Sequence, residues 1–494
     1  MSDTEGSEGS DYTFGDVPHA NYTGHHIQQF PIGVLQRMFK YWHAPYVKNL
    51  LSAVKSGRAY EERGMEAPFD LAEICREFRA AMQETPELWT VVYVNFTSGN
   101  EDLIPRLHEL LHFSKDERLT IIFQSVNVQA CETAWYQEMH KILEPIKFRW
   151  ATVAVSYARP QDLVDCWNRW PLLGSNVSDL RVWGSVQAGA SRIPVRFLQG
   201  GAALKRLELR NVAWIHKNQS SLRNVARLRV GPSVDEVLGH STVMELCASF
   251  PAITSLSLVA FETSTWTTHA GPLPATFALE HLTHLTVSPV LLATSLQGFE
   301  ERHVIPALMS CSIRFRQMDE ELEGDEEAEE STRRSQEDLA AVGTFLKEHE
   351  ITTLKLRGLD GGYAPLAVRT HLFEKMATKK LANLYLEECS GHTTEYIEMV
   401  LTKFIVRELP PNRLAGARSV PRTSLGGEAT IRLIPRLQYL YVYKCDDIDV
   451  TDLPTWVRDA PKTLKDVVIR GSKREIVEEE RYIEAKGIIN NRRM

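Results

Sequence analysis

Side chains that could do covalent or metal chemistry are scattered along this chain and lack the spacings that such chemistry requires. The sixteen histidines include no His-Glu-x-x-His pair, and no two of the seven cysteines lie within four residues of each other. There is no Gly-x-Ser-x-Gly turn for a nucleophilic serine and no glycine-rich phosphate loop. We therefore expect no catalytic residue, no metal site and no cofactor, and we interpret the chain as a binding protein.

Tyrosines and basic residues that alternate with apolar ones give a stronger signal. In a strand with one buried face, the residues between the buried positions point to the other face. Tyrosine contributes a large binding area at low entropic cost, and arginine pairs well with carboxylates and phosphates. These residues predict a concave surface for a protein with an acidic or phosphorylated segment. They are Tyr385, Tyr439, Tyr441, Tyr443, Lys205, Arg206, Arg210, Arg227 and Arg229, with Lys355 and Arg357 as an extension. For the basic positions, a solvated strand face without a partner is the alternative.

The elements that would carry these side chains follow a repeated pattern, apolar-x-x-apolar-x-apolar, which returns about every 20–30 residues as in solenoid proteins. The clearest copy is Leu204-x-x-Leu207-x-Leu209, whose last two apolar positions show the period of two of a half-buried strand. Eleven copies in series are hard to produce by chance. They begin at Trp150, Val177, Leu204, Val225, Ile253, Leu282, Leu308, Ile351, Leu381, Leu437 and Leu464.

Helices are predicted between several copies, at 241–252 and at 336–349. The second segment has an apolar stripe at helical spacing, formed by Leu339, Val342, Phe345 and Leu346. Strand, turn and helix repeated in this way predict an α/β leucine-rich-repeat solenoid over 96–475, with a curved parallel sheet inside and helices outside. A doubly wound α/β domain is the alternative, and it usually carries the glycine-rich turn that this sequence lacks.

Four polar segments are expected to lie outside the packed repeats. Residues 1–28 predict a disordered acidic and Ser/Gly-rich arm, and 476–494 a charged tail. The run Asp319–Glu330 has nine acidic residues and no basic one, which predicts a solvated loop at about 316–336. Proline, glycine and arginine predict another loop at about 407–429.

The charge and the cysteines limit the compartment and the partners. The net charge of −8 over 494 residues comes from the acidic run, and the remainder is nearly neutral, which argues against a nucleic-acid binder. The sequence has no run of eighteen apolar residues, so we expect no membrane span. The N-terminus lacks the features of a signal peptide. An odd number of scattered cysteines fits free thiols in a reducing compartment. We expect a cytoplasmic or nuclear protein.

Residues 29–95 break the repeat and predict a small helical module. Pro31 suits a helix start, and Leu35, Met38 and Phe39 follow it as an apolar stripe. A second helix is predicted with Asp70 as its N-cap, ending before Pro86. Leu88 and Trp89 follow as a buried anchor.

The residues of this module resemble the F-box motif. The matching segments are Phe30-Pro31, Leu35, Met38-Phe39, Leu71-Ala72-x-Ile74-Cys75-Arg76-x-Phe78-Arg79 and Thr85-Pro86-x-Leu88-Trp89. Thr-Pro-x-Leu-Trp before a strand and a long leucine-rich array is similar to the F-box/leucine-rich-repeat proteins abundant in mushroom-forming fungi. The helix and strand expected at 103–123 fit that layout. The chain departs from the motif by an insertion at about 43–68, by Gly33 where an acidic residue is common, and by Phe78 in place of tryptophan.

The resemblance implies a substrate-recognition subunit of an SCF-type, cullin-based ubiquitin ligase. The module would bind a Skp-type adaptor, and the repeat array would bind a protein substrate. The adaptor surface would comprise Phe30, Pro31, Leu35, Phe39, Leu71, Ile74 and Cys75, although the same residues could equally form the core of the module. The alternative is an adaptor-independent repeat scaffold whose N-terminal helices only cap the solenoid. A hydrolase on an α/β fold is a third possibility that lacks a nucleophile context.

Overall fold

The computed structural model divides the chain into two compact units, which are described separately. Unit 1 comprises Met1–Tyr93 and Asp102–Arg118, and unit 2 comprises Val94–Glu101 and Leu119–Met494. The residues that the structure describes are 30–56, 66–97, 103–126, 133–157, 159, 162, 176–184, 191–192, 203–210, 212–213, 223–231, 250–258, 278–293, 304–315, 325–360, 362–374, 380–406, 429–446, 448–471 and 479–492. The predicted arm at 1–28 therefore lies outside the described residues.

Unit 1 is helical. Its elements are α1 (Ile32–Ser56), α2 (Glu66–Ile74), α3 (Arg76–Gln83), the 3-10 helix η2 (Pro86–Trp89) and α4 (Leu103–Ser114). The extra residues from position 43 do not start a separate connection, because α1 continues through Pro45 to Ser56. The helix continues because its apolar face does, with Tyr46, Leu50 and Val54 all buried.

The predicted second helix is two helices, and Asp70 is not its N-cap. Asp70 lies inside α2 and is exposed. The break comes at Cys75, whose backbone is extended at φ −158° and ψ 170°. Its Sγ accepts a hydrogen bond from Phe78 N at 3.4 Å, so Cys75 caps α3.

Trp89 anchors the core of unit 1, as the sequence predicted. Its side chain is 1% exposed, its Nε1 donates to Met82 O at 2.8 Å, and its ring packs against Phe69 and Phe113. Thr85 is also buried, and its hydroxyl donates to Ala81 O at 2.7 Å. The side chains of the Thr-Pro-x-Leu-Trp segment therefore hydrogen-bond to the last carbonyl groups of α3 and end this helix.

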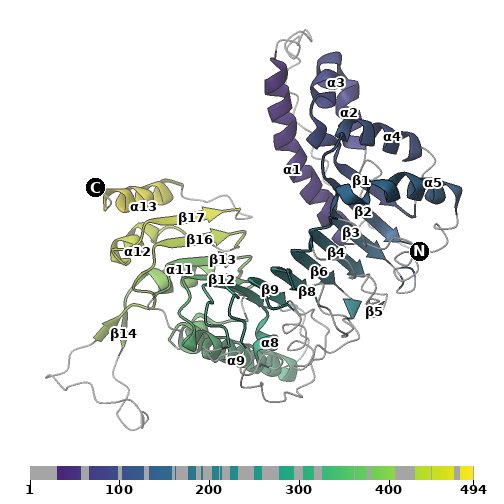
Figure 1. Cartoon of the computed structure of the whole chain (residues 1–494). Coiled ribbons are helices and arrows are strands. Elements are labelled where there is room, and N and C mark those ends of the chain that lie inside the picture. Colours follow the sequence, from purple (N-terminus) through teal and green to yellow (C-terminus); the bar gives the residue numbers. More distant parts are fainter. Residues whose placement is uncertain are drawn as a thin grey trace, which may run out of the picture. The chain divides into compact units, whose positions relative to one another are not determined.

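The main sheet has thirteen strands, and their order in the sheet is their order in the chain (Figure 1). From β2 onward every neighbouring pair is parallel. The strands are β1 (Val91–Asn95), β2 (Leu119–Val126), β3 (Trp150–Tyr157), β4 (Asp179–Gly184), β6 (Arg206–Arg210), β8 (Arg227–Val230), β9 (Ser255–Leu258), β10 (His284–Val287), β11 (Ser310–Arg314), β12 (Thr353–Arg357), β13 (Asn383–Glu387), β16 (Tyr439–Tyr443) and β17 (Asp466–Arg470). The sheet begins at β1, so the boundary predicted between residues 95 and 96 falls at the end of its first strand.

The predicted repeat is confirmed in the core. Each of the eleven copies provides one strand, from β3 to β17, and all three apolar positions of each copy are buried. The copy at Leu204, Leu207 and Leu209 is typical, with each side chain at most 2% exposed. Strands of equal register, following one another in chain order, have the architecture expected of a leucine-rich-repeat solenoid.

A shared turn after the last strands adds to this regularity. The residue that follows β12, β13, β16 and β17 has a positive φ in each case, at Gly358 (77°), Glu388 (52°), Lys444 (52°) and Gly471 (69°). Two repeats then place a buried cysteine at the same position, the one where leucine-rich repeats carry asparagine or cysteine. Cys389 N donates to Cys445 Sγ at 3.4 Å, which links the two repeats.

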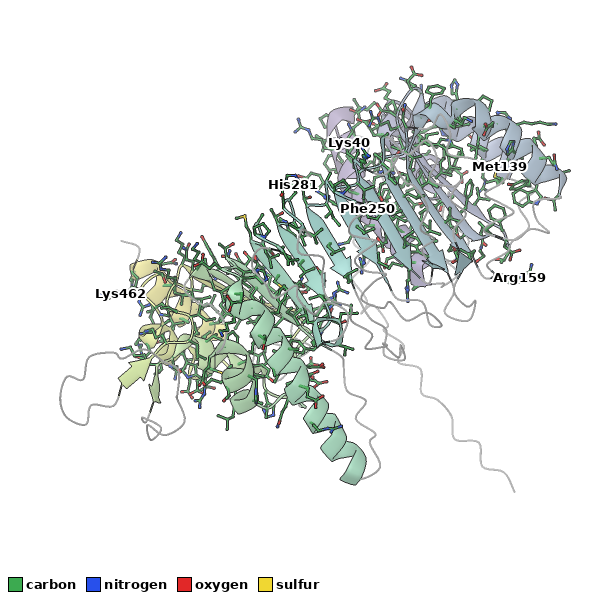
Figure 2. All side chains as sticks on the ribbon, turned by 60° about the horizontal axis from the view of Figure 1, so that its bottom comes forward. Lys40, Met139, Arg159, Phe250, His281 and Lys462 are labelled. Atoms are coloured by element: carbon green, nitrogen blue, oxygen red, sulfur yellow. The ribbon has the colours of Figure 1, made fainter. Side chains whose placement is uncertain are left out.

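Helices and two small strand pairs fill the connections. The helices of unit 2 are α5 (Ala134–Leu143), η4 (Glu144–Arg149), α8 (Pro289–Ala293), α9 (Asp325–Glu348), α10 (Pro365–Ala367), the π-helix η9 (Val368–Phe373), α11 (Thr393–Leu401), α12 (Leu453–Asp459) and α13 (Glu479–Asn491). Strands β5 (Ser191–Arg192) and β7 (Val212–Ala213) pair in parallel, and β14 (Phe404–Val406) and β15 (Ala429–Ile431) pair antiparallel. Met139 of α5, labelled in Figure 2, shows how such helices bury their apolar face, because it is fully buried.

The predicted acidic loop is helical along its described part. The acidic run was expected in a loop at 316–336, but α9 begins at Asp325. Glutamate and alanine favour helices, acidic side chains are stabilising near a helix N-terminus, and the predicted stripe from Leu339 to Leu346 anchors the other end in the core. Residues 316–324 and 407–428 lie outside the described part of the chain, as do 241–249 of the other predicted helix.

The C-terminal segment 476–494 is not a charged tail along its described length. Residues 479–491 form α13, which packs against α12 and β17 and buries Ala485 and Ile489. Arg492 donates to Arg458 O at 2.6 Å, which fixes the end of the helix. This helix covers the last repeat, a position where solenoids need a cap. Within the described ranges, no helix is long and apolar enough to span a membrane.

Candidate functional site

The predicted substrate residues belong to one face of the sheet, apart from Lys205. From β8 onward, strand positions alternate between buried and less buried side chains, and we call the less buried side the open face. In β6 the open-face residue Glu208 is buried as well. The strand register aligns the middle position of each strand in one row across this face. The row is Arg181, Glu208, Arg229, Ser257, Thr286, Ser312, Lys355, Tyr385, Tyr441 and Val468. Lys205 precedes β6 and is exposed, outside this alternation.

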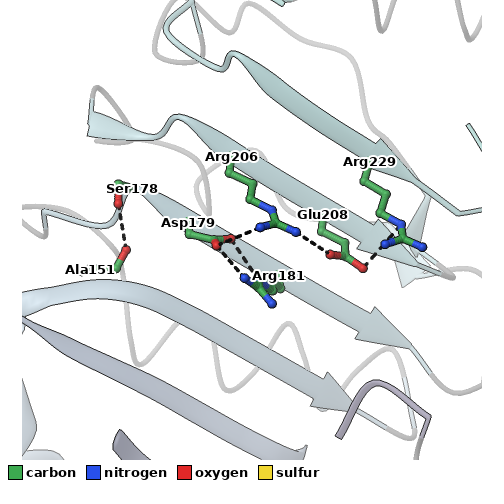
Figure 3. Close-up of polar contacts among 7 residues, drawn as sticks. All are labelled: Ala151, Ser178, Asp179, Arg181, Arg206, Glu208 and Arg229. Atoms are coloured by element: carbon green, nitrogen blue, oxygen red, sulfur yellow. Dashed lines mark hydrogen bonds and ion pairs between the residues drawn. The ribbon is translucent and has the colours of Figure 1, made fainter. Parts of the chain in front are cut away.

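The basic stretch at β4, β6 and β8 contains two acidic residues that the sequence reading missed. Arg206 lies 3.7 Å from both Asp179 and Glu208, and Arg229 lies 3.8 Å from Glu208 (Figure 3). The Glu208 side chain is only 4% exposed, so this carboxylate is buried among the arginines. The charges of Arg206 and Arg229 are therefore partly neutralised within the chain, contrary to the open basic patch that we predicted.

Arg181 was also missed, and it is the most firmly held of these arginines. Its Nε and Nη2 donate to the two carboxylate oxygens of Asp179 at 3.1 and 2.8 Å. Burial opposes the charged form, but the hydrogen bond and the charge of Asp179 outweigh it, so the pKa of Arg181 is raised. The signal was present in the sequence, because Asp179 and Arg181 alternate with buried Leu180 and Val182.

Arg210 and Arg227 complete the predicted basic group. Arg227 is exposed at the start of β8. Arg210 is half-buried at the end of β6, and burial together with the charge of Arg229 lowers its pKa. The two arginines therefore lie at opposite ends of their strands, on either side of the paired charges at Glu208 and Arg229.

The four predicted tyrosines lie on adjacent strands, and three of them stack. The rings of Tyr385 and Tyr441 are 4.4 Å apart and nearly parallel at 10°. Tyr439 and Tyr441 are 6.0 Å apart at 14°. Tyr443 is 44% exposed, with the Lys444 ammonium 5.5 Å from its ring centre. The three stacked rings cover one another, so the surface that they offer to a partner consists largely of ring edges and hydroxyl groups.

The basic extension on β12 is also paired. Lys355 Nζ lies 2.5 Å from Glu387 Oε1, and Arg357 forms a hydrogen-bonded ion pair with Glu388. Arg314 on the neighbouring strand β11 was not predicted. Its Nε is buried and has no hydrogen-bond partner among the described residues.

The predicted adaptor residues of unit 1 divide between core and surface. Leu35 and Phe39 are buried, and Phe39 packs edge-to-face on Phe78 at 5.0 Å. Leu71 and Cys75 are half-buried. On the surface, Phe30 is 48% and Ile74 58% exposed, and Pro31 is exposed too.

A second stripe of α1 is apolar and exposed, and the sequence reading missed most of it. Val34, Met38 and Tyr41 follow one another at helical spacing and are 40%, 52% and 84% exposed. Trp42 continues the stripe, half covered by Tyr46, on which it stacks at 5.0 Å. The sequence contained a sign of this exposed stripe, because the apolar residues of α1 occupy more than one face of the helix. A helix that buries a single face needs apolar residues on that face alone.

Where residues are described, no group of histidine, cysteine and acidic side chains could hold a metal ion. The described cysteines, Cys75, Cys311, Cys389 and Cys445, are free thiols. Burial strongly raises the pKa of Cys311, which keeps it protonated and unreactive.

Comparison with known proteins adds little. No protein-family model matches the sequence, and no curated protein matches it. Among solved structures, the leucine-rich repeat-containing protein LegL7 from Legionella pneumophila is similar, with a TM-score of 0.32 and 13% sequence identity over 61% of this chain and 91% of that one. A likeness of this degree decides nothing, and the repeat architecture of unit 2 follows from its own strand order and register.

Proposed function

We propose that this chain is a substrate receptor of a cullin-based ubiquitin ligase, in which unit 1 binds a Skp-type adaptor and the open face of unit 2 binds a protein substrate. The observation that carries the proposal is the exposed apolar stripe Val34, Met38 and Tyr41 on the first helix of the module that resembles an F-box. Exposed apolar patches on a folded unit commonly mark protein-interaction sites.

The two stripes of α1 separate the two roles that the F-box-like residues could have. Leu35 and Phe39 hold the helix on the core, and the stripe at Val34, Met38 and Tyr41 remains for a partner. Phe30, Pro31 and Ile74 supply further exposed apolar area on the same unit. The proposed adaptor surface keeps the predicted residues Phe30, Pro31 and Ile74 and adds Val34, Met38 and Tyr41. Leu35 and Phe39 support it from the core.

Co-purification of the full chain with a Skp-type adaptor tests the proposal. Met38→Asp should abolish retention of the adaptor, because it places a charge in the middle of the apolar contact. Met309→Asp is the matched control, since Met309 is 54% exposed and Met38 is 52% exposed, and it lies in unit 2. Leu35→Ala is a poor test, because Leu35 is 1% exposed and its loss would disturb the fold.

Failure of the folded wild-type chain to retain the adaptor would contradict the proposal. The adaptor-independent repeat scaffold would then be the better account of the same fold. Equal loss with Met38→Asp and Met309→Asp would also contradict it, since the contact would not depend on the α1 stripe.

A further inference from the structure

Among the described strands, β17 is the last of the main sheet, and one of its sides has no neighbouring strand. The inner side is bonded toward β16, where for example Asp466 N donates to Gln438 O at 3.1 Å. Backbone groups of successive residues in a strand point alternately to its two sides. The backbone groups of Val467 and Ile469 therefore point away from β16, toward the outer edge of the sheet.

A tyrosine of the C-terminal helix takes the place of a neighbouring strand at this edge. Helix α13 packs beside β17 (Figure 1). The Tyr482 hydroxyl donates to Val467 O at 3.1 Å and accepts a hydrogen bond from Ile469 N at 3.5 Å. A neighbouring strand would make the same two kinds of bond with β17. Tyr482 therefore covers an edge that is otherwise a template for pairing with another chain.

The helix that carries this tyrosine is weakly anchored. Among the side chains of α13 that the structure describes, only Ala485 and Ile489 are buried. Arg458 pairs with Glu484 at 2.8 Å, but the pair is exposed and contributes little to stability. Gly487 weakens the middle of the helix, and a Cβ at this position would meet no described atom within 4 Å, so packing does not require the glycine. We therefore expect that α13 can be displaced from β17 at a small cost in free energy.

The sequence of β17 is complementary to itself when two copies run antiparallel. In a pair centred on Val468, Val467 of one copy lies opposite Ile469 of the other. Both residues direct their backbone groups outward, so each such pair can exchange both of its N–H···O bonds. The same register places Asp466 opposite Arg470 at both ends, where a carboxylate meets a guanidinium. A register shifted by two residues would separate these charges.

We propose that the outer edge of β17 is a self-association surface, at which two copies of this chain pair their last strands antiparallel, and that α13 opposes this pairing by covering the edge. A two-fold axis relates the copies, so both use the same residues. Asp466 changes its partner on pairing, because the Lys486 ammonium that contacts it moves away with α13 and Arg470 of the second copy replaces it. The inference does not depend on the proposed ligase role, which uses unit 1 and the open face.

A second copy of the chain fits this edge better than an unrelated extended peptide. The hydrogen bonds would be alike for any extended chain, because they involve only the backbone. The charges distinguish the two, since the edge matches a strand that carries an anion and, four residues later, a cation. β17 has this pattern in Asp466 and Arg470, so every copy of the chain supplies the matching strand.

Sedimentation equilibrium of the full chain, which gives the dissociation constant of the dimer, tests the role of α13. Tyr482→Ala removes both hydrogen bonds between α13 and the edge, and it should lower this constant at least about tenfold relative to the wild type. Ile483→Ala is the matched control and should change it little, because Ile483 is the next residue of the same helix and is 61% exposed. Gly487→Ala should raise the constant, because it strengthens the helix that covers the edge.

Exchange of charges tests whether β17 itself forms the contact. In the Tyr482→Ala chain, Arg470→Glu places two anions opposite each other at both ends of the strand pair, and it should return the protein to the monomer. Asp466→Lys in the same chain places two cations there and should have the same effect. A mixture of these two chains should associate, because each anion of one then meets a cation of the other.

Equal dissociation constants for Tyr482→Ala and Ile483→Ala, including monomers at every concentration in both cases, would overturn the inference. A dimer of the Tyr482→Ala chain that survives Arg470→Glu would do the same, since the contact would then lie elsewhere. Circular dichroism shows that the two charge variants are folded. Failure of these folded chains to associate when mixed would exclude the antiparallel register centred on Val468.

Discussion

The early and late parts of the open face use the same strand positions for opposite kinds of chemistry. At β4 to β8 the side chains are Asp179, Arg181, Arg206, Glu208 and Arg229, which alternate in charge across the strands. At β13 and β16 three of the four corresponding positions are tyrosines, Tyr385, Tyr439 and Tyr441, which stack ring on ring. In both parts these side chains contact one another within a strand and across neighbouring strands. The difference shows that the open face has paired charges at one end and stacked aromatic rings at the other.

The physical consequence is a difference in sensitivity to salt. Ion pairs with arginines about 36% exposed are screened by solvent and salt, and the burial of Glu208 weakens this screening without removing it. Stacked rings depend on apolar burial and quadrupole contacts, which added salt does not screen. Between the two parts, the same row has the short hydroxyl side chains of Ser257, Thr286 and Ser312.

The largest expected loss of stability concerns the buried core beneath the open face. Here the early and late parts of the sheet should respond to substitution in the same way. Leu207 and Leu384 occupy the same repeat position in β6 and β13, and both are fully buried. Replacing either leucine by alanine should lower the free energy of unfolding by about 3 kcal/mol, because each change leaves a core cavity. Urea unfolding of the two variants measures this. A negligible cost in one of them would show that the repeats do not share one core.

The next effect should separate the two parts. Glu208→Ala leaves Arg206 and Arg229 without their buried partner, which should cost about 2 kcal/mol of unfolding free energy after allowance for the exposure of the arginines. Glu208→Gln keeps the shape and serves as a control with a smaller loss. The loss should shrink when urea unfolding is repeated at about 1 M salt, where charges are screened. A loss that is the same at both salt concentrations would contradict a charge lattice.

The smallest effect concerns the tyrosines. Tyr441→Ala removes the ring that contacts both Tyr385 and Tyr439, and should cost about 1 kcal/mol. Tyr441→Phe keeps the stacked ring and should change the free energy of unfolding by less than about 0.5 kcal/mol. Neither change in unfolding free energy should depend on the salt concentration. A marked salt dependence would contradict the difference between the tyrosines and Glu208.

The sequence predicted the core of the sheet well because burial is periodic. Leu204, Leu207 and Leu209 could be placed on one side of a strand by spacing alone, and the structure confirms every such copy. The same alternation brought Tyr385, Tyr439 and Tyr441 to one face. The alternation of residues in the strands therefore predicts both the core residues and the residues on the opposite face of the sheet.

The spacing of residues along the sequence did not predict which side chains contact each other. Arg206 and Arg229 were counted as open cations because Glu208, an acidic residue between two leucines, was not weighed with them. The acidic run was expected to be a loop, although Leu339 to Leu346 already predicted a helix that could extend back through it. In unit 1, Met38 and Phe39 are neighbours in one motif, and only the fold shows that Phe39 is in the core and Met38 on the surface.

Adaptor retention by three folded chains tests the account most directly. The wild type, Met38→Asp and Met309→Asp are each presented to a Skp-type adaptor. The account predicts that Met38→Asp loses the adaptor and that the wild type and Met309→Asp retain it. A folded wild type that does not retain the adaptor, or equal loss with both substitutions, would contradict an adaptor surface on α1.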